Sequence, residues 1–110
     1  MERSVAYSLR IVRLCRAIEK DSIGRTLGKQ ILRSGTSIGA NVHEAQGAQS
    51  KADFIAKMSV AHKEARETVY WLRVIREAGL IPPKRLTALV DETEQLIKML
   101  SSILLTSKSQ

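Results

Sequence analysis

Apolar residues recur at intervals of three and four along most of the chain, which is the period of amphipathic α-helices. In the first third, for example, Tyr7, Ile11, Leu14 and Ile18 fall on one side of a helix. The pattern is interrupted at three places and therefore predicts four helices, and no stretch alternates as a half-buried strand would. The expected helices cover about residues 2–20, 22–47, 50–78 and 84–106.

Glycine, serine and proline mark the expected ends of these helices. Gly47 fits a C-terminal glycine in the left-handed conformation, and Ser50 to Asp53 has the form of a capping box. Gly79 and the proline pair at 82–83 stop the third helix. Because the connections are short, neighbouring helices should run antiparallel. The sequence therefore predicts an all-α fold, an up-down-up-down antiparallel four-helix bundle forming a single domain over residues 1–110.

Four glycines lie within the second expected helix, at i, i+4, i+11 and i+15, and therefore within roughly 60° of one another. Each costs about 1 kcal/mol relative to alanine inside a helix, so four on one face need a reason. The phosphate-loop patterns GxxxxGKS/T and GxGxxG are absent, whereas a face without side chains lets another backbone approach closely. We therefore expect a packing face for a helix of the same bundle or of another subunit, formed by Gly24, Gly28, Gly35 and Gly39.

Positive charge is concentrated in the first third of the chain. The formal net charge is +7, and residues 1–40 carry eight Lys and Arg against three Asp and Glu. On the first helix the basic residues fall opposite the apolar stripe, which predicts a solvent face that is almost purely cationic. Such a face favours a polyanionic partner: RNA, DNA or an acidic protein surface. The residues expected to neutralise phosphates are Arg3, Arg10, Arg13, Arg16, Lys20, Arg25, Lys29 and Arg33.

The sequence offers little for catalysis or metal binding. The two histidines, His43 and His62, lie on separate expected helices, and the ExxH motif of carboxylate-bundle metal sites is absent. Cys15 lies on the apolar stripe and is interpreted as a small core residue rather than a nucleophile. We therefore expect no enzyme activity, no metal and no cofactor.

Apolar run length and cysteine content together indicate the cellular location. No apolar run is long enough for a transmembrane helix, so no membrane partner is expected, and the first residues lack the apolar core of a signal peptide. A single cysteine agrees with a reducing compartment. The expected location is cytoplasmic.

Three further side chains are expected to serve structure. Asn41 lies at the core edge of the second helix and is expected to make a hydrogen bond that fixes helix register. Glu44 is expected to pair with Lys or Arg of a neighbouring helix. Trp71 falls on a stripe rotated away from the core stripe of the third helix, which leaves two readings: a subunit interface or the edge of the bundle.

Two stretches, RSGTSIGANVHEAQGAQSKADF at 33–54 and EARETVYWL at 64–72, carry a family resemblance. The chain resembles bacterial four-helix-bundle proteins associated with intervening sequences of large-subunit ribosomal RNA, which are similar to the accessory variability protein of diversity-generating retroelements. The resemblance implies a homo-oligomeric ring, commonly a pentamer, and relatives that contact reverse transcriptase and nucleic acid through basic surfaces. Many members have Pro where this chain has Gly39, and Gly where it has Ala45.

These observations together predict a non-catalytic, homo-oligomeric helical bundle that binds nucleic acid through a basic face. Two alternatives stay open. One is an adaptor for an acidic protein partner such as a reverse transcriptase, and the other is a structural ring with no ligand.

Overall fold

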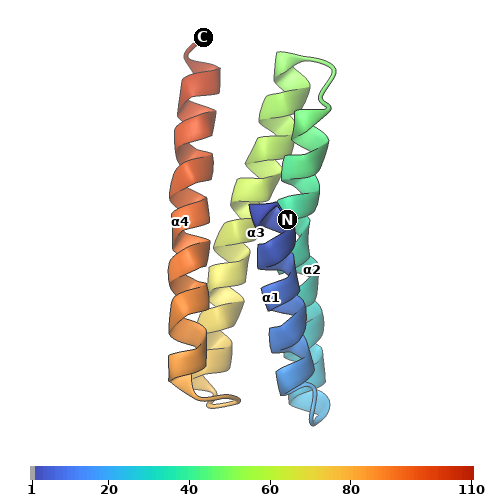
Figure 1. The fold of residues 1–110 in the computed structure, drawn as a ribbon, viewed down its shortest axis with the longest axis vertical. Coiled ribbons are helices and arrows are strands. Elements are labelled where there is room, and N and C mark those ends of the chain that lie inside the picture. Colours follow the sequence, from blue (N-terminus) through green and yellow to red (C-terminus); the bar gives the residue numbers. More distant parts are fainter. Residues whose placement is uncertain (1) are drawn as a thin grey trace.

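The computed structural model describes residues 2–110 as four long α-helices, with no strand in that range (Figure 1). The chain reverses direction at each of the three short connections, which gives an elongated body of 47 × 24 × 20 Å. The expectation of an all-α four-helix fold is confirmed, and the helix ends lie within two residues of the predicted ones. The helices are α1 (Arg3–Ile18), α2 (Ser22–Gln46), α3 (Lys51–Glu77) and α4 (Pro83–Lys108).

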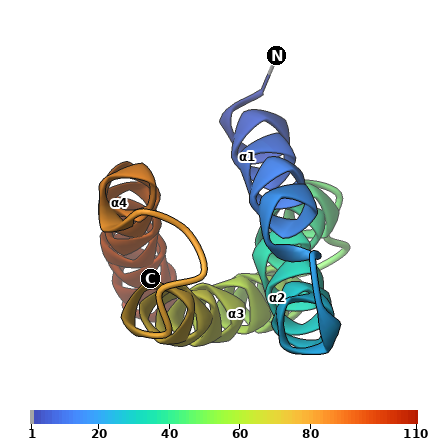
Figure 2. The ribbon, with the colours of Figure 1, turned by 90° about the horizontal axis from the view of Figure 1, so that it is seen from below.

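Consecutive helices pack against each other, with the most extensive contact between α2 and α3. Viewed from the end, the four helices follow an open U, with α1 and α4 at its two tips (Figure 2). The helix α1 has 16 residues, whereas the other three have 25 to 27, so one end of the bundle lacks a fourth helix beside α2, α3 and α4 (Figure 1). The bundle is therefore incomplete at one end, and α1 and α4 meet through side chains such as Tyr7 and Thr93.

Two hydrogen bonds between buried hydroxyls fix the axial register of two helix pairs. The Tyr7 hydroxyl lies 2.5 Å from Thr93 Oγ1 and joins α1 to α4, while Ser34 and Thr68 meet at 3.0 Å between α2 and α3. Thr93 donates its own proton to the Leu89 carbonyl at 2.7 Å, so Tyr7 is the donor of the first bond. Each pair would leave a buried polar group unsatisfied if its helices slipped by one turn.

The helix ends on either side of α3 largely follow their local chemistry. Ser50 Oγ accepts from the Asp53 N–H at 3.0 Å, as a capping residue does. Gly79 has a φ of 72° and ends α3, and the N–H of Leu80 bonds back to an earlier carbonyl, as in a Schellman motif. The prediction for Gly47 is wrong: its φ is −102°, outside the left-handed region. Its N–H still bonds to α2 carbonyls, so the link to α3 needs no left-handed residue there.

Cys15 is a buried thiol on α1, packed within the core as expected. Its Sγ lies 3.3 Å from the Gly28 carbonyl, to which the thiol donates. Burial, with a smaller contribution from the Glu19 carboxylate, raises the pKa of Cys15 from 9.0 to about 11. The thiolate is therefore scarce at neutral pH.

We expect iodoacetamide at pH 8 to alkylate Cys15 in the folded protein at least about a hundredfold more slowly than in denaturant, because both the thiolate fraction and access are reduced. Mass spectrometry of quenched time points measures both rates. Equal rates in the folded and unfolded protein would contradict the buried placement.

Candidate nucleic-acid interface

The glycine face of α2 is covered by α1 of the same chain. A Cβ added at Gly24 would lie 1.7 Å from the Ile18 carbonyl oxygen, and one at Gly35 would lie 2.8 Å from the Ile11 side chain. At Gly39 the nearest atom is Ser4 Cβ, at 3.2 Å. The sequence left open whether this face receives a helix of the same bundle or of another subunit, and here α1 occupies it. At Gly24, Gly35 and Gly39 the missing side chain thus leaves room for α1 to pack closely on α2.

All eight basic residues of the predicted interface are at least partly exposed, but three of them have partners within the chain. Arg10 forms an ion pair with Glu92 of α4. Arg33 pairs with two carboxylates of α3, one of them Glu64 at 3.1 Å. Arg3 donates to a glutamine side chain of α4 at 3.4 Å. These three residues therefore join helices, a role that a helical wheel of one helix cannot reveal.

The other five basic residues are exposed and have no carboxylate within 4 Å among residues 2–110. They lie towards the turn that joins α1 to α2, where their charge is opposed by the exposed acidic residues Glu19 and Asp21. The cationic surface is consequently smaller than the sequence predicted. We call it the hairpin patch: Arg13, Arg16, Lys20, Arg25 and Lys29.

The outer face of α1 is more apolar than the sequence predicted. Val5 is 47% exposed, and together with the partly buried Leu9 and Val12 it lines a shallow groove against Ala40 of α2. The expectation of an almost purely cationic solvent face is therefore wrong for the first half of α1. The cause is that α1 has two apolar sides, of which only one is covered by the bundle.

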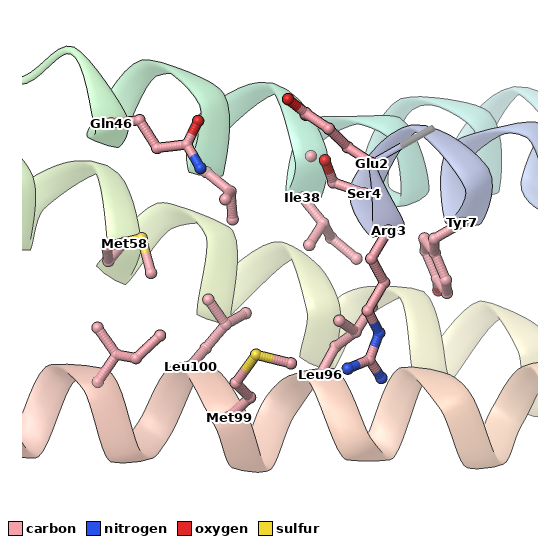
Figure 3. A pocket seen from close by; sticks show the side chains of 13 residues that line it. Glu2, Arg3, Ser4, Tyr7, Ile38, Gln46, Met58, Leu96, Met99 and Leu100 are labelled. Carbon is pink, nitrogen blue, oxygen red and sulfur yellow. The ribbon is translucent and has the colours of Figure 1, made fainter.

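A second apolar depression lies beyond the N-terminal end of α1, where the bundle has only three helices. Its volume is about 370 Å³. Figure 3 shows the side chains of Ile38, Met58, Leu96 and Leu100 around it, with Arg3 at its edge. The ionisable residues of its lining are Glu2, Arg3 and Tyr7, and its shape follows from the shortness of α1.

The side chains predicted to serve structure make local contacts. Asn41 Nδ2 donates to the Ser37 carbonyl at 2.9 Å within α2 itself, so the bond does not join two helices. Glu44 pairs with Lys57 of α3 at 3.3 Å.

Trp71 is partly exposed and packs at the edge of the core. It donates through Nε1 to Glu67 Oε2 at 2.9 Å and meets the exposed ring of Tyr70 edge-on, with ring centroids 5.0 Å apart.

With this geometry in place, comparison with known proteins gives the family. The family described as 23S rRNA-intervening sequence protein matches residues 1–102. The chain belongs to this family. The resemblance inferred from residues 33–54 and 64–72 is thereby confirmed. No curated protein matches the chain.

A solved structure of similar fold supports the assignment. It is a protein of unknown function from the S23 ribosomal protein family of Bacteroides thetaiotaomicron VPI-5482, 42% identical over 92% of this chain and 94% of its own, with a TM-score of 0.87. Family membership therefore fixes the architecture of this rRNA-intervening sequence protein but does not name an activity. None of the helices within residues 2–110 combines the length and the hydrophobicity that a membrane-spanning segment needs.

One contact that the sequence did not predict joins His62 to a serine. His62 Nε2 of α3 lies 2.8 Å from Ser101 Oγ of α4 at the protein surface. A nucleophilic serine also needs donors for an oxyanion, but the backbone N–H groups around it are engaged within helices. Among residues 2–110, no group of three or more His, Cys, Asp or Glu side chains could hold a metal. The pair is best described as a link between α3 and α4.

Proposed function

We propose that this protein binds nucleic acid, without catalysis, through the hairpin patch. One observation carries the proposal: five exposed cations lie near one end of the α1–α2 hairpin, none with a carboxylate within 4 Å in the part of the chain described. The five cations outnumber the neighbouring Glu19 and Asp21, and this excess of like charge does not stabilise the fold, so a polyanion is the partner that fits them.

The chemistry of this patch favours phosphate neutralisation over base recognition. None of its five members is aromatic or an amide, and stacking on aromatic rings is how most single-stranded RNA is recognised. Binding of this kind is nearly independent of sequence and weakens steeply as salt displaces the protein from the phosphates.

Reversing the charge of Arg16, Arg25 and Lys29 to Glu should weaken binding to a labelled RNA by about thirtyfold or more, because three phosphate contacts become repulsive. Fluorescence anisotropy over a salt series measures this for RNA and for DNA. The matched control reverses three exposed cations of α3 and α4, Lys63, Arg66 and Lys98, and should lose much less.

Equal losses in the two triple variants would contradict the proposal, as would the absence of binding at low salt. Co-purification of an acidic protein, without nucleic-acid binding, would instead favour the adaptor function.

We further propose that the protein acts as a homo-oligomer in the cytoplasm, with a pentamer favoured by the family resemblance. Two exposed apolar surfaces support an assembly: Val5 with its groove on α1, and Tyr70 beside Trp71 on α3. Light scattering at several concentrations measures the mass, and a monomer throughout would contradict this proposal.

A further inference from the structure

Three arginines from helices far apart in sequence line one depression of the surface. Arg10 and Arg13 come from α1, and Arg85 comes from the first turn of α4. The depression has a volume of about 190 Å³. Its remaining lining is apolar and comes from α1, α4 and the loop before α4: Leu14, Ile81 and Leu89.

The charges around this depression are only partly balanced. Arg10 pairs with Glu92, whereas the exposed Arg13 and Arg85 have no carboxylate within 4 Å among residues 2–110. Three guanidinium groups and one carboxylate leave a net charge of +2. An anion with two negative charges would therefore balance the depression.

The sequence of α4 adds to this excess of positive charge. Lys84 and Arg85 stand in its first turn, which has no acidic residue and no side-chain cap. Cations at this end of a helix oppose the helix dipole and destabilise the fold. The folding of α4 therefore does not explain why an arginine of α4 lines the same depression as Arg13.

We propose that this arginine depression binds one phosphate group, carried as a monoester. A phosphomonoester has a charge between −1.5 and −2 near neutral pH, and guanidinium forks bind its oxygens in pairs. The volume accommodates one such group with a few waters. A single protein carboxylate would leave one positive charge unbalanced.

The phosphate group could come from two sources. One is the end of a nucleic-acid strand, and for this source the inference rests on the proposed nucleic-acid function. The other source is a free phosphate compound. The arginine depression lies beside the hairpin patch and shares Arg13 with it, so a strand end bound there would bring its backbone near Arg16.

The first experiment records the arginine Nε–Hε signals of the full chain by ¹⁵N NMR while inorganic phosphate replaces chloride at constant ionic strength. Saturable shifts at Arg13 and Arg85, several times larger than those at Arg16 and Arg25, are expected. Shifts of the same size at all four arginines would overturn the proposal, since they would report only a general ion atmosphere.

The second experiment identifies the source with two RNA 12-mers that differ only in a 5′-phosphate. If strand ends are bound, the phosphorylated RNA should bind about tenfold tighter, and the double variant R13Q/R85Q should abolish that difference. The control variant R16Q/R25Q removes the same amount of charge outside the depression and should preserve the difference in affinity between the two RNAs. No advantage for the phosphorylated RNA, with phosphate still shifting Arg13 and Arg85, identifies a free phosphate compound as the source.

The two proposals fail separately. Phosphate binding at Arg13 and Arg85 without any RNA binding would contradict the nucleic-acid function and support the phosphate site. RNA binding through the hairpin patch, with no specific response of Arg13 and Arg85 to phosphate, would support the nucleic-acid function and contradict the phosphate site. Far-UV circular dichroism of each variant checks that the helices are intact.

Discussion

Replacing Gly24 with alanine is expected to destabilise the protein by about 3 kcal/mol, with a melting temperature lower by about 12 °C. The added Cβ would lie 1.7 Å from the carbonyl oxygen of Ile18. That atom belongs to the backbone at the end of α1, so no side-chain rotation relieves the overlap. The turn between α1 and α2 would have to open, and part of the α1 core contact would be lost.

Gly28 provides the matched control one helical turn away. A Cβ there would make ordinary contacts, with the nearest atoms of Ile18 at 3.9 Å. Gly28→Ala should therefore be neutral or stabilising by up to about 1 kcal/mol, since alanine favours a helix over glycine. Gly35→Ala should fall between the two, because its neighbour is the Ile11 side chain, which can partly move.

Thermal unfolding followed by circular dichroism at one fixed protein concentration ranks these three variants. A Gly24→Ala protein as stable as Gly28→Ala would show that the close approach of α1 to α2 is not what these glycines serve.

Alkaline pH is expected to remove about 3 kcal/mol of stability through one side chain, Tyr7. Burial is the main cause that raises the pKa of Tyr7 from 10.0 to about 12. Below pH 10 the phenol is protonated in both the folded and the unfolded chain, and its contribution is fully present. Between pH 10 and 12 only the unfolded chain ionises, which draws the equilibrium towards unfolding.

Denaturant unfolding at several pH values measures this effect, and Tyr7→Phe is the control. The variant should lose about 1 kcal/mol at neutral pH with the hydrogen bond, but its stability should fall less between pH 10 and 12. Because the pKa of Cys15 is also raised, to about 11, both proteins are best compared in a Cys15→Ala background. Parallel pH profiles for the two proteins would contradict a buried, protonated Tyr7.

Periodicity was sufficient to predict the four helices because each one buries a continuous stripe. The predicted stripe of Tyr7, Ile11, Leu14 and Ile18 is buried as expected. The signals that mark helix ends are equally local: Ser50 caps the start of α3, and Gly79 ends it. The prediction of a left-handed conformation for Gly47 was wrong because glycine also adopts negative φ values, and the residue type alone does not distinguish the two conformations.

The candidate site could be predicted less completely from the sequence than the helices could. A helical wheel places Arg10 and Arg33 on a charged face, but their carboxylates come from α4 and α3, as many as 82 residues away. The same separation hid Arg85, which joins the arginines of α1 only through the fold. Pairing between distant residues leaves no periodic trace in a single sequence.

The sequence by itself determined the helices, most of their ends and a glycine face on α2, because these depend on residues within a few turns of one another. Only the tertiary structure decided that α1 covers that face, which cations remain unpaired, and that Arg13 and Arg85 share one depression. Those features depend on how separate helices lie side by side. That arrangement is set by packing over the whole core and by buried bonds such as that between Tyr7 and Thr93.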